Sequence, residues 1–236
     1  MRAVIVSVDY SDLLQITLPR NIHHFSNVTI VTTPDDHATH TLARSMQCDV
    51  LKTDLFYADG ARFNKFRALE YALDIVGRYG WLCLLDADIV LPSTLCDFNP
   101  VIGKLYSPLR KWWPNVMQTI PEAAVWDKLP YIEKPGSHCF AGYTQIFHAD
   151  DPVLINTPWH RLNYDNASDG DTDFSRKWAK SNRVRTAFDV LHLGDIATNW
   201  CGRATAYADG TIPRDAESRV AAVSEFLRRR KKHTRR

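Results

Sequence analysis

Two aspartates separated by one residue, Asp86 and Asp88, directly follow the apolar run of residues 81–85. Alternate residues of an extended chain point in the same direction, so both carboxylates can face one cleft beyond the end of a strand. Two such charges repel each other unless a cation lies between them. Oxygen ligands suit hard cations such as Mg²⁺ or Mn²⁺, which commonly bind phosphate groups as well. The pair therefore predicts a divalent metal site, and the alternative is a helix cap next to a surface acid.

The segments that must position these aspartates alternate between strand-like and helix-like patterns. Short apolar runs rich in β-branched residues are typical of buried strands, and they lie at residues 3–8, 28–31, 50–51 and 81–85. Helical signals are a capping residue or an apolar period of three to four, and they lie at residues 11–18, 33–36 and 63–76. This alternation predicts an α/β fold with a largely parallel sheet flanked by helices.

Ligands bind beyond the carboxyl ends of the strands in open sheets of this kind. Tyr10, Thr33 and Asp86 each follow a strand-like run, so we expect them to converge on one crevice. Residues 105–140 interrupt the regular pattern with many prolines and aromatic residues, and long irregular insertions are often functional. Trp112 and Trp113 in this insertion are candidates for stacking against an acceptor, and the alternative is that they anchor local packing.

The composition suits one globular domain, because 45% of the 236 residues are hydrophobic and 24% are charged. We expect this domain to span residues 1–227, with a nucleotide-binding part at about residues 1–100 and an acceptor-binding part at about residues 101–200. The last nine residues, 228–236, include seven Lys or Arg, starting at Arg228 and ending at Arg236. Without them, 22 basic residues face 27 acidic ones, a formal net charge of −5. The basic tail predicts either a frayed terminus or an arm that binds nucleic-acid phosphates.

Signals for membrane insertion and secretion are missing from this sequence. No apolar run reaches the roughly 18 residues that crossing a bilayer requires, and the strand-like start at residues 3–8 does not resemble a signal peptide. The five cysteines are odd in number and form no Cys-x-x-Cys pair, which disfavours a zinc site and a disulfide framework. We therefore expect no transmembrane segment and a cytoplasmic location.

Several motifs together resemble those of GT-A-fold glycosyltransferases of the family 2 type, over about residues 3–195. The matching stretches are Val8-Asp9-Tyr10 and residues 60–65 (GARFNK), 84–88 (LLDAD), 170–174 (GDTDF) and 191–194 (LHLG). The resemblance implies a Rossmann-like GT-A sheet. It also implies a metal-dependent transfer of a sugar from a nucleotide-sugar donor, a UDP-sugar by preference, to an acceptor hydroxyl.

The resemblance assigns a role to each matching residue. Asp86, Asp88 and His192 would hold Mn²⁺ or Mg²⁺ at the diphosphate, and Asp171 would accept the acceptor's proton in a single displacement with inversion. The residues implied on the donor side are Val8, Tyr10, Thr33, Arg62, Lys65, Asp86 and Gly142. On the acceptor side, Asp173 joins Trp112 and Trp113.

Three positions depart from the family pattern. Thr33 stands where the family often has an acid that reads uracil, which leaves the donor base open. Phe66 replaces a glycine near the start of the predicted helix, so the start of that helix is expected to differ. Gly170 replaces the acid before the catalytic base, which removes one contact to the acceptor.

Other functions fit parts of the sequence. Residues 86–90 (DADIV) also match the Asp-x-Asp motif of haloacid-dehalogenase-like phosphatases, although that family carries it on the first strand and Ser175 stands where its later acid belongs. An inactive GT-A domain that binds nucleic acid through residues 228–236 is a second alternative. For an active transferase, a hydroxymethylated base in DNA is one acceptor hypothesis, and such a base must be reached outside the stack.

Overall fold

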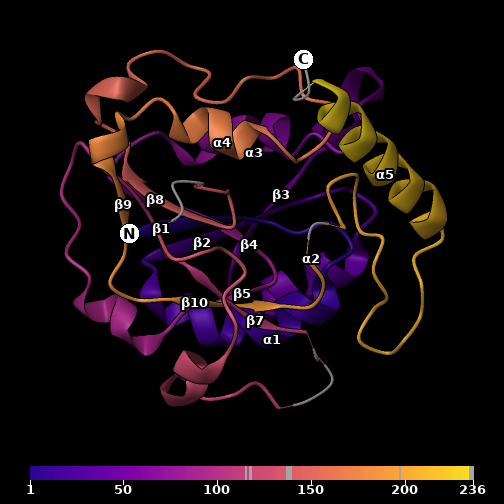
Figure 1. Ribbon diagram of the computed structural model, residues 1–236, viewed down its shortest axis with the longest axis horizontal. Helices are drawn as coiled ribbons and strands as arrows, with labels where there is room; N and C mark the ends of the chain where they lie inside the picture. Colours follow the sequence, from indigo (N-terminus) through magenta and orange to yellow (C-terminus); the bar gives the residue numbers. More distant parts are fainter. Residues whose placement is uncertain (115, 117–118, 137–139, 197, 234–236) are drawn as a thin grey trace.

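A mixed β-sheet forms the centre of the computed structural model, which describes residues 1–114, 116, 119–136, 140–196 and 198–233, with side chains up to residue 229 (Figure 1). Strand β1 lies between β2 and β4 and is parallel to both, whereas β8 runs antiparallel to its neighbours β4 and β6. The expected α/β class with a largely parallel sheet is confirmed, because four of the six strand pairs are parallel. In spatial order the strands are β3 (Asp49–Lys52), β2 (Asn27–Thr32), β1 (Arg2–Val6), β4 (Trp81–Asp86), β8 (Thr144–His148), β6 (Leu105–Ser107) and β9 (Arg183–Arg185).

A smaller sheet lies beside the end of β4. It contains β5 (Ile89–Val90), β10 (Val190–Leu193) and β7 (Arg110–Trp113) in the order β5, β10, β7. His192 pairs with Ile89 on one side and with Trp112 on the other. This register brings His192 next to the chain that has just left Asp88.

Helices cover both faces of the large sheet (Figure 1). On one face, Val4 of β1 belongs to the same apolar cluster as Phe66 and Leu69 of α3. On the other face, Ile5 belongs to a cluster with Leu14 of α1. Alternate residues of one buried strand therefore pack against different helices, as a strand covered on both sides requires. The helices are α1 (Ser11–Asn21), α2 (His37–Ser45), α3 (Lys65–Val76), α4 (Gly170–Ser175) and α5 (Ala216–His233).

Side-chain caps fix where two of these helices begin. Helix α3 begins where the Asn64 side chain accepts the N–H groups of Phe66 and Arg67, at 3.2 and 3.3 Å. Helix α2 begins later than the sequence predicted. Residues 33–36 precede it, because Asp36 is its cap and accepts the N–H of Thr39 at 3.1 Å.

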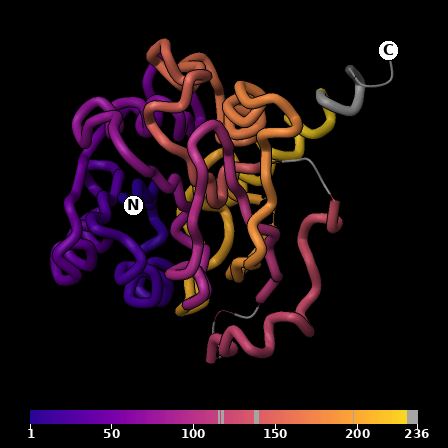
Figure 2. The backbone as a smooth tube through the Cα atoms, turned by 90° about the vertical axis from the view of Figure 1, so that its left-hand side faces the viewer, coloured from indigo at the N-terminus to yellow at the C-terminus, as the bar shows by residue number. Residues whose placement is uncertain are grey.

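The insertion is more regular than its composition predicted. Residues 105–140 supply β6 to the large sheet and β7 to the small one, and they contain the short helix η4 (Ala123–Lys128). Figure 2 shows part of this segment, in pink, along the side of the molecule away from the indigo N-terminal strands. The other short 3₁₀ helices are η1 (Ile22–His24), η2 (Leu55–Gly60), η3 (Ser93–Asp97), η5 (Pro152–Leu154) and η6 (Lys180–Asn182).

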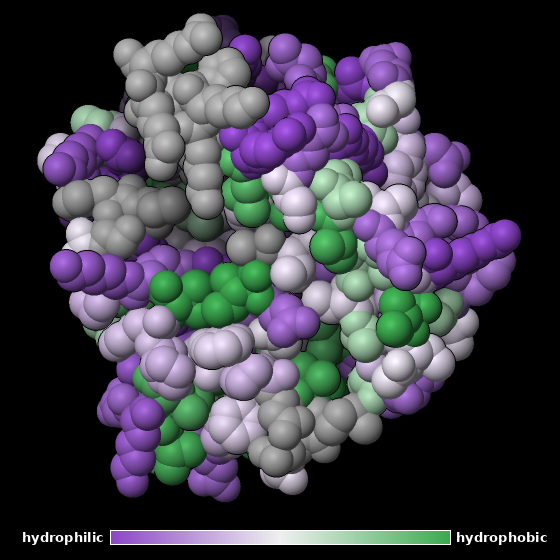
Figure 3. Space-filling model, turned by 45° about the vertical axis from the view of Figure 1, so that its right-hand side comes forward, coloured by the Kyte–Doolittle hydropathy of each residue, from purple (hydrophilic) through white to green (hydrophobic). Residues whose placement is uncertain are grey.

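The basic C-terminal stretch continues a helix. Helix α5 extends to His233, so residues 228–233 are helical, and residues 234–236 lie outside the described residues. Arg62 ties α5 to the rest of the molecule through Glu225 at 3.9 Å. In the described part of the chain, no helix combines the length and the apolar character needed to span a membrane. Figure 3 shows hydrophobic groups interspersed with hydrophilic ones on the face that it draws.

Candidate active site

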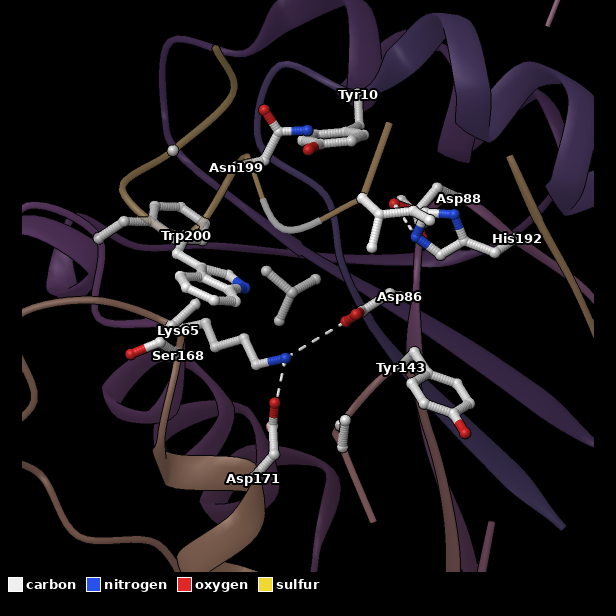
Figure 4. A pocket seen from close by; sticks show the side chains of 18 of the residues that line it. Tyr10, Lys65, Asp86, Asp88, Tyr143, Ser168, Asp171, His192, Asn199 and Trp200 are labelled. Carbon is white, nitrogen blue, oxygen red and sulfur yellow. Dashed lines mark hydrogen bonds and ion pairs between the residues drawn. The ribbon is translucent and has the colours of Figure 1, made fainter. Parts of the chain in front are cut away.

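A cavity of about 340 Å³ lies at the carboxyl ends of β1 and β4 (Figure 4). Its volume falls in the range of small-molecule sites, which begins at about 300 Å³. The strand ends, the starts of α3 and α4, and strand β10 all contribute to its walls. The residues predicted from the sequence that line it are Val8, Tyr10, Lys65, Asp86, Asp88, Gly142, Asp171 and His192.

Lys65 joins two carboxylates at the centre of this cavity. Its Nζ lies 3.4 Å from Oδ1 of Asp86 and 3.3 Å from Oδ1 of Asp171 (Figure 4). Burial alone would lower the pKa of Lys65, but the two carboxylates outweigh burial and raise that pKa above its usual value. Lys65 is therefore a permanent cation between the metal motif and the candidate base.

Ionisation of the Asp86 and Asp88 carboxyl groups is unfavourable because both groups are buried. Burial raises the pKa of each carboxyl to about 6. The ammonium of Lys65 lowers the pKa of Asp86 and the guanidinium of Arg110 lowers that of Asp88, but neither cation cancels the effect of burial. A bound cation would relieve this cost, because it favours the ionised form of both groups.

His192 faces Asp88 across the edge of the small sheet. The Nε2 atom of His192 lies 3.6 Å from Oδ2 of Asp88. Burial, helped by the nearby Arg110, lowers the pKa of His192 to about 4, so its ring is neutral at pH 7. Within the described residues, Oδ1 of Asp88 and Nδ1 of His192 are buried without a hydrogen-bond partner. Buried polar atoms rarely stay unpaired, so this pair is poised for a ligand.

The metal prediction fits this half of the cavity, with one restriction. In the described part of the chain, no group of three or more His, Cys, Asp or Glu side chains is arranged to hold a metal ion. Asp88 and His192 could supply one oxygen and one nitrogen ligand, while Asp86 is paired with Lys65. Mg²⁺ and Mn²⁺ commonly complete their ligands with water and substrate phosphates. The residues therefore fit a divalent ion that arrives with a phosphate-bearing ligand.

Two glycines make room for the charged centre. A Cβ atom at Gly142 would lie 1.8 Å from Oδ1 of Asp171, so a side chain at position 142 would displace the carboxylate. A Cβ atom at Gly170 would lie 2.3 Å from Cε2 of Phe66. Phe66 and Gly170 were separate departures from the family pattern in the sequence. In space they form one contact, in which the phenyl ring occupies the room that a side chain at position 170 would need.

The two predicted acceptor tryptophans lie outside the cavity lining. Nε1 of Trp112 donates to the carbonyl of Gly194 at 2.9 Å, and the carbonyl of Trp113 accepts the N–H of Gly194 at 2.9 Å. Trp113 also packs against the cluster that contains Leu191. These contacts make both tryptophans anchors that hold β7 against β10, and so they fix the strand that carries His192.

Three other predicted residues also lie outside the lining. The buried Thr33 is turned toward α2, where its carbonyl is 2.8 Å from Nε2 of His40. Arg62 is tied to Asp165 at 3.6 Å. Asp173 lies on another side of α4 and pairs with Arg176 at 3.1 Å.

The cavity also contains residues that the sequence reading missed: Arg110, Tyr143, Asp195, Asn199 and Trp200. Tyr143 follows the glycine already singled out in the sequence. Asp195 lies three positions after His192, so the late motif pointed near it. Arg110 and Trp200 carried no sequence signal, because only the pairing of β7 with β10 and the path of the chain after β10 bring them to the cavity.

Comparison with protein families and with curated proteins gives no match. Among solved structures, glucosyl-3-phosphoglycerate synthase from Mycobacterium tuberculosis, in complex with Mn²⁺, uridine diphosphate and glucosyl-3-phosphoglycerate, is similar over 94% of this chain and 78% of that chain. Their identity is 10% and the TM-score is 0.48. Mannosyl-3-phosphoglycerate synthase from Rubrobacter xylanophilus is similar over 63% of this chain and 53% of its own, at 18% identity and a TM-score of 0.41.

A third similar structure, 4-diphosphocytidyl-2C-methyl-D-erythritol synthase from Anaerococcus prevotii, matches 96% of this chain and 95% of its own, at 10% identity and a TM-score of 0.44. At these identities and TM-scores the likenesses assign neither a family nor an activity to this chain, and its α/β fold is established by its own sheet order. The chemistry of this chain rests on its own residues.

Proposed function

We propose that this chain is a metal-dependent glycosyltransferase that moves a sugar from a nucleotide-sugar donor to an acceptor hydroxyl. One observation carries the proposal. One cavity at the carboxyl ends of the strands is lined by Asp86 at the end of β4, Asp88 just after it, Lys65 at the start of α3, Asp171 on α4 and His192 on β10. Sheets of this type bind their ligands there.

Asp88 and His192 would hold the divalent ion, with Asp86 beside them. When bound, such an ion neutralises the charge that develops on a departing diphosphate. The Lys65 ammonium lies where it can also pair with a phosphate oxygen. His192 suits its role because its ring is neutral at pH 7 and therefore has a lone pair to offer.

Asp171 would act as the base. Its carboxylate takes the proton of the acceptor hydroxyl while the hydroxyl oxygen attacks the anomeric carbon, and the bond from that carbon to the diphosphate breaks with inversion. Oδ1 of Asp171 is paired with Lys65 at 3.3 Å. A diphosphate competing for the ammonium would loosen this pair, which would couple donor binding to release of the base.

Calorimetry with nucleoside diphosphates and nucleotide sugars, with and without Mn²⁺, tests the proposal. The wild type should bind one nucleotide in a metal-dependent way, and Asp88→Ala should abolish the metal dependence. Asp150→Ala is the matched control, because the Asp150 side chain is 75% exposed and follows β8 outside the cavity. Binding of no nucleotide under either condition would contradict the proposal. The anomeric configuration of the product, measured by NMR, separates inversion from retention.

A hydroxymethylated base in DNA is the acceptor that the position of α5 favours. Phe226 of α5 packs edge-on against the cavity residue Trp200, with ring centroids 6.1 Å apart, and the basic stretch begins two residues later at Arg228. The basic stretch therefore continues the helix whose Phe226 contacts the cavity wall. Deletion of residues 228–236 should weaken duplex DNA binding and flatten its salt dependence, by about 0.9 in slope for each phosphate that the tail no longer neutralises. An unchanged slope would contradict this acceptor.

The phosphatase alternative is disfavoured by the fold. Its motif belongs on a first strand, whereas Asp86 ends β4, the fourth strand along the chain. The alternative of an inactive domain predicts no transfer or hydrolysis of any nucleotide sugar. A sensitive hydrolysis assay on the wild type distinguishes it from the enzyme.

A further inference from the structure

Residues 199–203, which follow β10, include three that line the cavity and are held at two places. On one side, the carbonyl of Trp200 accepts the N–H of Ala167, in the loop before α4, at 3.0 Å. On the other side, the buried Arg203 donates to the carbonyl of Asp9 at 2.8 Å and forms an ion pair with Asp12 of α1. The segment therefore has a fixed position relative to both α1 and the loop that leads to Asp171.

Trp200 is the large aromatic side chain that this segment adds to the cavity wall. Figure 4 shows its indole across the cavity from Asp88 and His192, beside Ser168 and the stem of Lys65. Phe226 supports the indole from α5 in an edge-on contact at 6.1 Å and 84°. The ring is thus held in place while it still borders the cavity.

A second aromatic ring, that of Tyr10, lies on an adjoining wall. The guanidinium of Arg203 lies 4.7 Å from the centroid of the Tyr10 ring, and Tyr10 itself borders the cavity. Arg203 therefore fixes both walls, because the same side chain stacks on Tyr10 and anchors the segment that carries Trp200. Flat rings on adjoining walls suit a planar heteroaromatic group, because every nucleobase has a face that stacks on aromatic side chains.

The end of β2, where the sequence placed the base, is closed by contacts within the protein. Asp36 accepts the N–H of Asp9 at 2.9 Å and the hydroxyl of Thr32 at 3.0 Å. Arg219 of α5 lies 3.7 Å from the Asp9 carboxylate. Thr33 lies outside the cavity lining as a result, so the base of a nucleotide whose diphosphate lies near Asp88 has to meet another wall.

We propose that Trp200 is the stacking platform for the nucleobase of the donor, in a site formed with Tyr10 and closed on one side by Ser168. This inference rests on the proposed function, because it takes the diphosphate to lie near Asp88 and Lys65. The ligand group is a planar purine or pyrimidine. Trp200 gives affinity for the base, and the sugar and the acceptor bind elsewhere.

Binding of ligands with and without a base tests the role of Trp200. The probes are UDP, CDP, ADP and GDP, and inorganic pyrophosphate as the ligand that lacks a base, all titrated at one fixed Mn²⁺ concentration. Trp200→Ala and Trp200→Leu should weaken the preferred nucleotide by about tenfold or more, the size of one missing base stack. Both variants should leave pyrophosphate affinity within about twofold, and Trp200→Phe should retain most nucleotide affinity.

Trp81→Phe is the matched control, because Trp81 begins β4 at the end away from the cavity and packs edge-on against His148. Equal losses for nucleotide and pyrophosphate in Trp200→Leu would overturn the inference, since they would mark a general change in the cavity. Unchanged nucleotide affinity in Trp200→Ala would also overturn it, yet would leave the proposed function intact. If the wild type binds none of the nucleotides, the proposed function itself fails.

Discussion

The two halves of the cavity differ in how their charges are satisfied. In one half, which we call the Lys65 half, the Lys65 ammonium pairs with Asp86 at 3.4 Å and with Asp171 at 3.3 Å. In the other half, the Asp88 half, the Asp88 carboxylate lies 3.6 Å from the neutral ring of His192 and feels the Arg110 guanidinium, and each of Asp88 and His192 keeps a buried atom without a hydrogen-bond partner in the described part of the chain. The charges of the first half are therefore paired within the protein. The second half is arranged for a cation that the protein does not itself supply.

This difference indicates that the two halves have different roles, one in stability and catalysis and the other in metal-dependent binding. A buried cation paired with two carboxylates stabilises the native state and holds Asp171 in position. Unpaired buried polar atoms are costly and uncommon in proteins, and a bound ion is one way to satisfy them. Changes in the Lys65 half should therefore lower turnover or stability, whereas changes in the Asp88 half should lower metal-dependent binding and leave the protein as stable or more so.

The largest expected effect is on turnover in Asp171→Asn. The amide keeps the size of the side chain but cannot accept the acceptor's proton, so kcat should fall by about 10²- to 10⁴-fold. Metal-dependent binding of the nucleotide should stay within about fivefold of wild type, because that binding belongs to the other half. Steady-state kinetics and calorimetry on the same preparation measure the two effects.

The matched control is Asp97→Asn, which changes an exposed carboxylate outside the cavity. Turnover by Asp171→Asn within about tenfold of wild type would exclude Asp171 as the base. A parallel collapse of nucleotide binding would instead show that the two halves are not separate.

Removal of the resident cation should cost stability. Lys65→Met keeps the stem and leaves Asp86 and Asp171 facing each other without a cation between them. Breaking a buried ion pair costs about 3–5 kcal/mol, and because Asp86 is partly open to the cavity we expect a loss of about 2 kcal/mol in the free energy of unfolding. Urea denaturation without metal at pH 7 measures it.

Lys65→Arg is the control for this change, since it keeps the charge and should retain most of the stability. Equal stability of Lys65→Met and wild type would show that the pairs contribute nothing. The Lys65 half would then not be the stabilising half of the cavity.

The packing behind the Lys65 half should tolerate no added methyl group. In Gly170→Ala the new Cβ would meet Phe66, whose ring stacks against His160 at 5.5 Å and cannot simply move aside. Overpacking of this kind costs about 1–3 kcal/mol, so the melting temperature should fall by several degrees. Thermal denaturation followed by circular dichroism measures the change.

A double mutant tests the contact itself. Phe66→Leu frees space, so the pair Phe66→Leu with Gly170→Ala should be more stable than the sum of the single effects predicts. Strict additivity would mean that the two departures from the family pattern are independent.

The sequence predicted Lys65, Asp171, Asp88 and His192, which lie in both halves, and fewer of the other cavity residues, for a physical reason. Asp86 and Asp88 follow a buried strand, and Asp171 and His192 lie in short motifs, so local pattern was enough to find them. Arg110 and Trp200 reach the cavity through the pairing of β7 with β10 and the path of the chain after β10, which no local pattern encodes. The same pairing places Trp112 and Trp113 outside the cavity lining.

The fold shows the same limit. The strands at residues 28–31 and 81–85 were predicted almost to the residue, because continuous apolar runs identify buried strands. The start of α2 was misplaced by four residues, since Asp36 serves as a cap and also accepts the N–H of Asp9, in the loop after β1. The role of a side chain that is fixed by tertiary contacts cannot be predicted from its neighbours in the sequence.

The smallest expected effect has the opposite sign and lies in the Asp88 half. Burial raises the pKa of the Asp88 carboxyl to about 6 from an ordinary value of 3.8. The folded state therefore holds this proton more tightly than the unfolded state, and the free energy of unfolding falls as the pH rises from about 4 to about 6. Asp88→Asn removes that cost, so the metal-free variant should be more stable than wild type by about 1–2 kcal/mol at pH 7. The advantage should vanish near pH 4, where the Asp88 carboxyl of the wild type is largely protonated in both the folded and the unfolded protein.

Urea denaturation at pH 4, 5.5 and 7 with a chelator present measures the difference in stability, and calorimetry should show that the same variant has lost metal-dependent nucleotide binding. A variant that is less stable than wild type at pH 7 would mean that Asp88 already has a stabilising partner, and the contrast between the two halves would be wrong.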